Sequence, residues 1–209
     1  MPVIITEHPL ISDCLVHLRD RRTGPVEFRQ YIRRAAMLLI CEAVRDIPLK
    51  RAEIVTPLGH AVGELLADPR VVAVPILRAG LGMLGALLDL FPNAIVGVIG
   101  LHRDEKTFSP REYYHSLPEN LSRKTALILD PMLATGGSLL AAIALLKKKK
   151  AGDIRAVTLV AAPDGVRRVE RRYPEVRVYT ASIDARLNKN AYIVPGIGDA
   201  GDRIFGTAR

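Results

Sequence analysis

Apolar residues follow two different spacings along the chain, and each spacing predicts a different kind of element. Between residues 10 and 47 they recur at helical intervals, with one break at Thr23-Gly24-Pro25. This stretch therefore predicts two helices joined by a turn. Later apolar runs are short, continuous and rich in β-branched residues, which is typical of buried strands. These predicted strands span residues 71–77, 95–101, 126–129, 154–162 and 176–182.

Helical patterns alternate with these strands, at residues 81–90, from residue 139 onward and at residues 165–173. The alternation predicts an α/β fold, with a mostly parallel sheet flanked by helices. Ligands of such sheets bind at the carboxyl ends of the strands. Because Arg78, Arg103 and Asp130 each follow a predicted strand, we expect a functional site where these three residues meet.

Two regions fit this pattern less well. Residues 104–122 form a polar stretch that is too long for an ordinary connection. It predicts either a lid or arm, or an exposed hairpin that only makes an oligomer contact. Residues 48–69 carry no motif that we can match, and we assign them, together with the first two helices, to an N-terminal helical cap at residues 1–70.

Composition narrows the class of protein. The chain has 209 residues, of which 49% are hydrophobic, enough for the core of a single domain. No apolar run reaches the length of about 18 residues that a membrane span needs, so we expect a soluble, cytoplasmic protein without a membrane partner. Cys14 and Cys41 lack C-x-x-C spacing and are expected to be buried or half-buried thiols. The five histidines are too scattered to predict a structural zinc site.

The formal net charge of +8 predicts a positive field that favours polyanions or a multiply phosphorylated substrate. The four lysines at residues 147–150 resemble a nucleic-acid patch at first sight. They close an apolar helix just before Gly152, however, where cations stabilise the carbonyl end of the helix dipole. We therefore interpret them as a solvated helix end.

The most informative motif is Asp130-Pro131-Met132-Leu133-Ala134-Thr135-Gly136-Gly137-Ser138, which joins a predicted strand to a predicted helix. Its glycines let the backbone turn tightly and bring N–H groups close to a ligand. Its two hydroxyl groups add donors at the positive end of the helix. The motif predicts a loop that binds phosphate.

A second glycine motif competes with this interpretation. The segment Gly80-Leu81-Gly82-Met83-Leu84-Gly85 fits G-x-G-x-x-G after a strand, and Asp104 and Glu105 lie where a ribose-binding acid would follow in a dinucleotide site. That interpretation leaves the phosphate loop unexplained and places Arg78 at the mouth of the motif without a role. A Walker A motif is absent from the sequence.

Three long segments, taken together and in order, resemble the uracil phosphoribosyltransferase family. They are Val74-Pro75-Ile76-Leu77-Arg78-Ala79-Gly80-Leu81-Gly82-Met83, the phosphate-loop motif, and Tyr192-Ile193-Val194-Pro195-Gly196-Ile197-Gly198-Asp199-Ala200-Gly201-Asp202. The likeness covers about residue 71 to the C-terminus, with a weaker match over the first helices. It implies a type I phosphoribosyltransferase fold, with an α/β core at residues 71–182 and a base-binding hood at residues 183–209.

The resemblance also implies an activity. Enzymes of this family transfer the phosphoribosyl group of 5-phosphoribosyl 1-diphosphate (PRPP) to N1 of uracil, giving UMP and diphosphate in pyrimidine salvage. The resemblance implies Mg²⁺ held mainly through PRPP, with no metal ligand assigned to the protein, and a homo-oligomer, either a dimer or a tetramer. Some relatives are activated by GTP, which leaves a GTP effector open here.

Site residues follow from the positions in these motifs. The resemblance implies that Arg78, Arg103, Asp199 and the loop from Asp130 to Ser138 bind PRPP, and that Asp130, Arg103 and Asp199 are catalytic. It implies that uracil is held by Ile193, Gly198, Asp199 and Ala200. Many phosphoribosyltransferases place two adjacent acids in the phosphate loop, whereas here Pro131 stands in the second position, as it does in the uracil enzymes.

The chemistry of the reaction agrees with these roles. Departure of diphosphate leaves an oxocarbenium-like ribose, which needs positive charge near the leaving group and negative charge near the ribose. Other interpretations stay open: Arg78 in a plain surface ion pair, Asp130 as a helix cap, and the glycine-rich segment as a structural hairpin. A phosphoribosyltransferase for another base, or a regulator that keeps the fold but binds nucleic acid, would also fit parts of the sequence.

Overall fold

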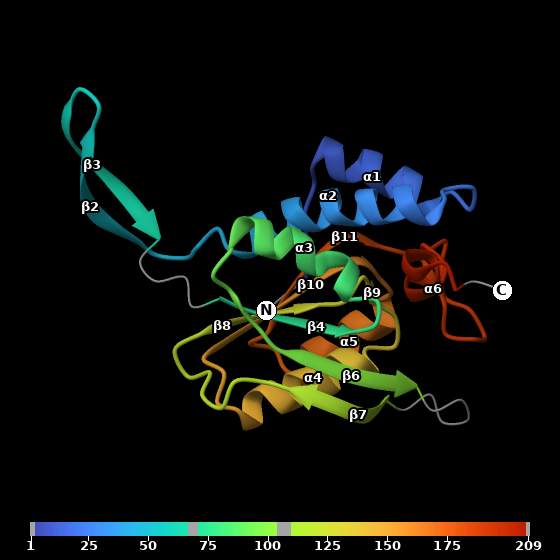
Figure 1. Ribbon diagram of the computed structural model, residues 1–209. Coiled ribbons are helices and arrows are strands. Elements are labelled where there is room, and N and C mark those ends of the chain that lie inside the picture. The colour runs from blue at the N-terminus through green and yellow to red at the C-terminus, as the bar shows by residue number, and fades with distance from the viewer. Residues whose placement is uncertain (1–2, 67–70, 104–109, 208–209) are drawn as a thin grey trace.

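A single central sheet organises the molecule in the computed structural model, which describes residues 3–66, 71–103 and 110–207 (Figure 1). Its strand order is β1-β11-β10-β8-β4-β6-β7, and every pair along this order is parallel except β6 with β7. Two short strands, β5 and β9, pair with β4 and β10. The sheet strands are β1 (Val3–Ile5), β4 (Val71–Leu77), β5 (Ile95–Val96), β6 (Val98–Arg103), β7 (Pro110–Ser116), β8 (Thr125–Leu129), β9 (Met132–Leu133), β10 (Asp153–Ala161) and β11 (Arg177–Ile183).

The continuous apolar runs form strands because both faces of the sheet are covered. Along β4, Val72 and Val74 pack into the core on one face, while Val71 and Ala73 pack into the core on the other. A strand with an exposed face would alternate apolar and polar residues instead. The mostly parallel sheet predicted from the sequence is confirmed, and residues 95–101 are divided between β5 and β6.

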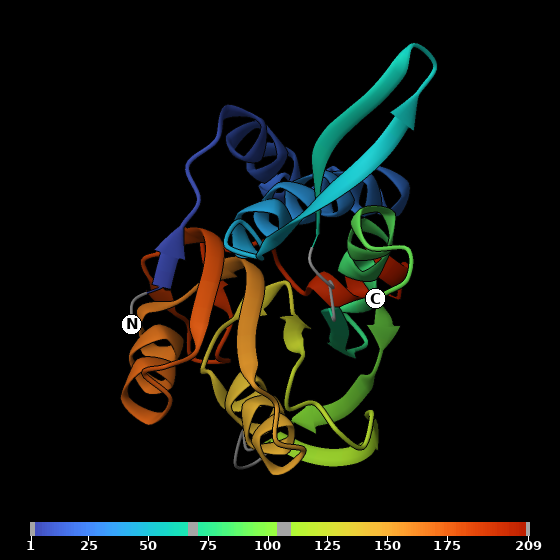
Figure 2. The same cartoon turned by 90° about the vertical axis from the view of Figure 1, so that its left-hand side faces the viewer.

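Helices cover both faces (Figures 1 and 2). One face carries α1 (Pro9–Arg19), α2 (Pro25–Ala43) and α3 (Leu81–Leu90), and the other carries α4 (Gly137–Lys148) and α5 (Pro163–Arg172). Both α1 and α2 begin with a proline at the first helical position, where its missing N–H costs no hydrogen bond. The predicted break at residues 23–25 and the basic end of the helix before Gly152 are both confirmed.

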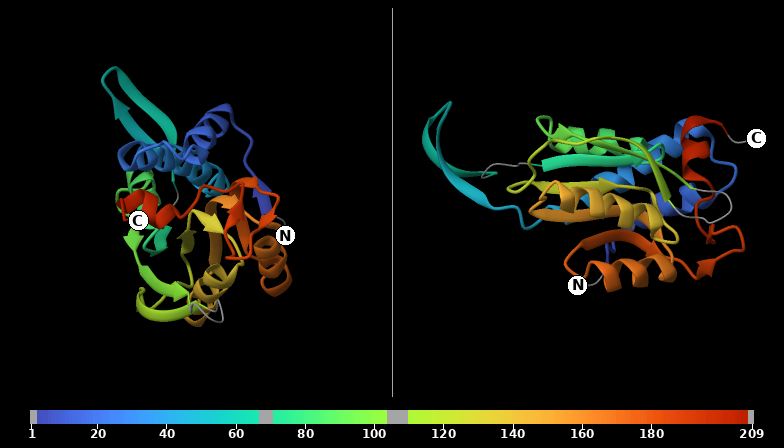
Figure 3. Two further views of the ribbon diagram at one scale, coloured as in Figure 1. Left: turned by 90° about the vertical axis from the view of Figure 1, so that its right-hand side faces the viewer. Right: turned by 90° about the horizontal axis from the view of Figure 1, so that it is seen from below.

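The prediction of a helical cap over residues 1–70 is only partly right, because this region also contains strands. Residues 49–66 form an antiparallel hairpin of β2 (Leu49–Thr56) and β3 (Gly59–Leu66), which projects from the body at one end of the molecule (Figures 1 and 3). The strand β1, at the start of the same cap, is the edge strand of the central sheet. The hairpin has side chains exposed along both strands, because it extends beyond the helices that would cover it.

The polar stretch at residues 104–122 lies partly outside the described residues. Its described part includes β7, an exposed strand that pairs with β6 at the edge of the sheet. The described residues 110–116 are therefore an exposed edge strand, and both interpretations of the stretch, a lid or arm and a hairpin that only makes an oligomer contact, stay predictions. Asp104 and Glu105, the acids of the competing dinucleotide motif, lie outside the described residues.

The two cysteines differ in burial. Cys14 is buried, but Cys41 is exposed, so the prediction of a buried or half-buried thiol is wrong for Cys41. The inward positions of α2 at this point are taken by Leu39, Ile40 and Ala43, which turns residue 41 to solvent. Within the described ranges, every helix is too short or too polar to cross a membrane.

The C-terminal segment lies at the end of the molecule opposite the hairpin (Figures 1 and 3). It contains β12 (Arg186–Leu187), β13 (Ile193–Val194) and the short helix α6 (Ala200–Phe205). Since β4 and β8 run toward this end, their carboxyl ends meet the C-terminal segment, and the space between them is the candidate site.

Candidate functional site

A cavity of about 360 Å³ lies between the carboxyl ends of the sheet strands and the C-terminal segment. Residues from both sides line it. They are Ile76, Leu77, Arg78, Ala79, Leu101, Asp130, Met132, Ala134, Ser138, Ala191, Tyr192, Ile193, Asp199 and Gly201. Such a volume suits a small molecule.

Arg78 stands where β4 ends. Its Nη2 atom lies 3.2 Å from Oδ1 of Asp202 on α6, and its guanidinium carbon lies 5.6 Å from the centre of the Phe205 ring. The side chain therefore reaches across from the sheet to the C-terminal segment. Because the pair with Asp202 is exposed, the pair itself contributes little to stability, and the guanidinium can turn to an anionic ligand.

Asp130 occupies the corresponding position after β8. Its backbone N–H donates to the carbonyl of Val157 at 3.2 Å, and its Oδ1 accepts from the N–H of Met132 at 3.3 Å. These bonds fix the carboxylate at the start of the phosphate loop, where it lines the cavity. The site thus carries a cationic and an anionic group from neighbouring strands.

The phosphate loop turns into α4 through Gly136, whose φ of +80° is a left-handed conformation that favours glycine. Thr135 Oγ1 accepts from the N–H of Gly137 at 3.5 Å, and Nη1 of Arg168 donates to the Thr135 carbonyl at 2.7 Å. The first N–H groups of a helix have no partner within the helix. Residues 135–139, at this helix start, line a small hollow of about 30 Å³, which is a suitable place for an anion.

The glycine-rich C-terminal segment forms the opposite wall. Gly196 and Gly198 have φ of +61° and +71°, so the chain turns sharply twice between Ile193 and Asp199. Asp199 caps α6, since its Oδ1 accepts from the N–H of Asp202 at 2.9 Å. The second carboxylate oxygen of Asp199 can also accept a hydrogen bond from a ligand.

The cavity and the small hollow together collect most of the predicted site residues. Those that line it are Arg78, Asp130, Met132, Ala134, Ser138, Ile193 and Asp199, and those that line only the small hollow are Leu133, Thr135, Gly136 and Gly137. Gly198 and Ala200 flank Asp199 without lining the cavity, and Ala200 is buried. Arg103 is the last residue of β6, and its side chain lies outside the described part of the structure.

Pro131 lies apart from both hollows, although it was predicted to bind PRPP. It is buried, and its carbonyl accepts from the N–H groups of Leu159 and Val160 at 3.0 and 3.1 Å. Pro131 therefore ties the loop to β10.

Sequence reasoning missed part of the lining. Tyr192 is 43% exposed and lines the cavity beside Ile193, with Ala191 next to it in a left-handed conformation. The available signal was an aromatic residue next to a predicted base contact, because an aromatic ring can stack on a flat ligand. Ile76, Leu77 and Leu101 also contribute, and as apolar strand residues they gave no signal beyond burial.

Comparison with known proteins gives a consistent result. The family model described as "Uracil phosphoribosyltransferase" matches residues 5–207. A uracil phosphoribosyltransferase of Dictyoglomus thermophilum is 47% identical over 98% of this chain and 99% of its own length. One of Geobacillus kaustophilus is 49% identical over 98% of each chain.

Solved structures agree at the level of the fold. A protein from Aquifex aeolicus superposes with a TM-score of 0.94 and 38% identity, over 99% of both chains. A hypoxanthine phosphoribosyltransferase from Staphylococcus aureus superposes with a TM-score of 0.51 and 18% identity, over 76% of each chain. The second likeness concerns the fold alone, which is that of the type I phosphoribosyltransferases.

Proposed function

The chain belongs to the uracil phosphoribosyltransferase family, and from this premise we infer that it transfers the phosphoribosyl group of PRPP to N1 of uracil, giving UMP and diphosphate. One observation carries the inference. The cavity joins the phosphate loop, the Asp130 carboxylate and the glycine-rich segment in one space. A nucleoside monophosphate has a phosphate, a ribose and a base in the same order.

The 5-phosphate of PRPP binds the loop at residues 135–138 in this proposal. The N-terminal N–H groups of α4 and the hydroxyls of Thr135 and Ser138 are suitable donors for its oxygens. The bond from Arg168 to the Thr135 carbonyl holds the loop from outside. Binding here fixes the ribose near Asp130.

Asp130 acts on the ribose. As the bond from the anomeric carbon to diphosphate breaks, positive charge develops on the ribose, and a carboxylate fixed before the reaction stabilises it. The same group can accept hydrogen bonds from the ribose hydroxyls. Uracil N1 then forms the new bond to the anomeric carbon, and the N1 proton is lost.

Positive charge at the leaving group comes from Arg78, with Arg103 proposed beside it from the end of β6. Mg²⁺ usually takes one or two carboxylates together with substrate phosphates and water. Asp130 and Asp199 both line the cavity, which fits this donor set, and the described residues contain no group of three or more metal-ligating side chains. When bound through PRPP, Mg²⁺ supplies charge that stabilises the departing diphosphate.

The base binds the glycine-rich segment in this proposal. Uracil presents an acceptor, a donor and an acceptor along O2, N3–H and O4, which a row of backbone groups between Ile193 and Ala200 can match. Cytosine reverses this pattern at N3 and at the exocyclic group. Groups left unpaired in a closed site reject an analogue by up to about 10⁴-fold.

Two features beyond the reaction belong to the same proposal. A two-stranded hairpin is marginally stable alone in water, and β2–β3 exposes Ile54, Val62 and Leu65, so we propose that it packs on a second copy in a homo-oligomer. Because PRPP is too highly charged to cross a membrane, the reaction is expected in the cytoplasm.

The test is to offer uracil, cytosine, orotate and hypoxanthine in parallel with PRPP and Mg²⁺, and to follow nucleotide and diphosphate formation. The proposal expects UMP from uracil and about 10⁴-fold less product from cytosine. Product from another base alone would favour a different phosphoribosyltransferase. No product from any base would favour a nucleic-acid-binding regulator.

A further inference from the structure

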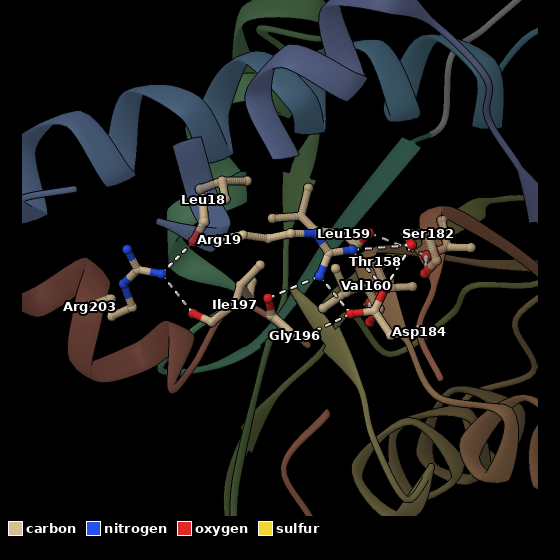
Figure 4. Close-up of polar contacts among 11 residues, drawn as sticks. Leu18, Arg19, Thr158, Leu159, Val160, Ser182, Asp184, Gly196, Ile197 and Arg203 are labelled. Carbon is tan, nitrogen blue, oxygen red and sulfur yellow. Dashed lines mark hydrogen bonds and ion pairs between the residues drawn. The ribbon is translucent and has the colours of Figure 1, made fainter. Parts of the chain in front are cut away.

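Arg19, at the end of α1, forms a partly buried ion pair with Asp184, which follows β11 (Figure 4). The two side chains meet in a fork, with Nη1 to Oδ2 and Nη2 to Oδ1 both at 2.7 Å. The Asp184 side chain is 2% exposed. The two residues are 165 positions apart in the sequence, and their further hydrogen bonds join Ser182 and Gly196.

The ion pair holds both backbone polar groups of Gly196, which belong to the two peptide groups on either side of its α-carbon. The N–H of Gly196 donates to Asp184 Oδ2 at 2.8 Å, and the carbonyl of Gly196 accepts from Arg19 Nη1 at 3.0 Å. Ser182 Oγ donates to Asp184 Oδ1 at 2.8 Å, so each carboxylate oxygen has two donors. Such charge-assisted bonds are short and fix geometry strongly.

A second arginine holds the next residue. Arg203 donates through Nη1 to the carbonyls of Ile197, at 2.9 Å, and of Leu18 (Figure 4). Its Nη2 donates to the carbonyl of Asp20 at 2.6 Å. Its guanidinium carbon lies 4.1 Å from the centre of the Phe28 ring. The end of α1 is thereby tied to the glycine-rich segment at two successive residues.

These contacts decide which backbone groups remain for a ligand. The N–H and carbonyl of Gly196 and the carbonyl of Ile197 are already bonded to side chains of the protein, and neither residue lines the cavity. Gly196 has a left-handed φ of +61°, so the relative orientation of its two flanking peptide groups sets the direction in which the chain continues to Asp199. Asp199 and Ile193, on either side of the held turn, line the cavity.

We propose that Arg19 and Asp184 are positioning residues for recognition of the base: their ion pair fixes the two peptide groups that flank the Gly196 α-carbon and, through them, the backbone groups that bind uracil. The proposal rests on the proposed function. It assigns part of base recognition to α1, outside the motifs that line the cavity. A displacement of about 1 Å in a binding group can cost about 10²-fold in activity.

The experiment compares Arg19→Met, Arg19→Lys and a control, Arg155→Met. Arg155 is 5% exposed in its side chain and pairs with Asp46 and Asp153 near the opposite end of β10, so its loss destabilises the fold without touching the glycine-rich segment. For each variant we measure the KM for uracil, the KM for PRPP, and the ratio of the rates with uracil and with cytosine. All measurements are made at a temperature below that at which any variant unfolds.

The proposal expects Arg19→Met to raise KM for uracil by at least about tenfold and to lower the uracil-to-cytosine ratio, with KM for PRPP changed less than about twofold. Arg19→Lys, which keeps the charge but not the fork, should recover part of the loss. Arg155→Met should leave both KM values near those of the wild type. Equal changes in both KM values, or no change in a folded Arg19→Met protein, would overturn the proposal.

Hydrogen exchange of the segment at residues 193–200 provides a readout that does not need activity. Arg19→Met should speed exchange there relative to the wild type, and Arg155→Met should not. If the wild type forms no UMP, the proposed function fails, and unchanged exchange in Arg19→Met would overturn the positioning role independently.

Discussion

Asp130 holds its carboxylate where β8 ends: its backbone N–H donates to the carbonyl of Val157, and its Oδ1 accepts from the N–H of Met132. The Asp130→Asn variant keeps the size and most hydrogen bonds of this side chain but loses its charge. We expect turnover to fall by about 10²-fold, because one fixed group that stabilises transition-state charge is removed. The melting temperature should change by about 4 °C or less, which corresponds to about 1 kcal/mol.

Initial rates with uracil and PRPP, beside a thermal melt, check this expectation. Asp164→Asn is a matched control, since Asp164 is an exposed acid on α5 that pairs with Arg167. Near wild-type turnover in Asp130→Asn, or an equal loss in Asp164→Asn, would contradict the role given to Asp130.

Asp184 makes stability depend on acid pH. Burial raises the pKa of its carboxyl, but hydrogen bonds from Arg19, Ser182 and the Gly196 N–H outweigh burial, and the net pKa is lowered. Because the folded pKa lies below the unfolded value of about 3.9, ionised Asp184 stabilises the folded state fully at pH values above about 3.9. This stabilisation is lost as the pH falls through the folded pKa.

The Asp184→Asn variant should therefore be less stable than the wild type at pH 7, and the gap should narrow as the pH falls from about 5 to 3. Urea unfolding at several pH values in this range measures the difference in free energy. A gap that stays constant or widens toward acid would show that ionised Asp184 does not stabilise the fold.

The positions of residues in short motifs could be predicted well from the sequence, whereas contacts between residues far apart in the sequence could not. Asp130 and Arg78 follow apolar runs, so their place at the carboxyl ends of strands follows from the pattern. The pairing of Arg19 with Asp184 depends on how α1 packs over the end of β11, and no local pattern encodes that packing. Pro131 belongs to the motif by sequence, yet its carbonyl serves β10.

The β2–β3 hairpin is the element that the sequence described least. Alternation identifies a strand when one face is buried, and this hairpin exposes apolar residues on both faces, including Ile54 and Val55. The register pairs Ile54 with Ala61 and Lys50 with Leu65, so Ile54 and Leu65 share one face. That face is the surface we expect against a second copy.

The Ile54→Glu, Leu65→Glu double variant tests the hairpin as an oligomer contact. Two buried charges without partners would strongly disfavour the contact, so sedimentation velocity should show a shift from oligomer to monomer. Arg51→Gln, on the other face of β2, should sediment like the wild type. A wild type that is monomeric at every concentration, or a double variant of unchanged mass, would rule out this role.

The sheet brings the separate motifs together at the scale of the whole molecule. Parallel strands end at one edge, so β4 and β8 deliver Arg78 and Asp130 to the same side as the phosphate loop, and α1 and α6 hold the glycine-rich segment across from them. The alternating pattern predicted the sheet and its ligand edge. It could not predict the cavity shape, because this depends on the turns at Gly196 and Gly198.

A crystal structure of the protein with UMP tests the central claim most directly. The account predicts the phosphate at the N-terminus of α4, within hydrogen-bond distance of the backbone N–H groups at residues 135–138. It predicts the ribose beside Asp130 and the base against the segment from Ile193 to Ala200. A phosphate bound away from the loop, or a base that does not contact this segment, would contradict the account.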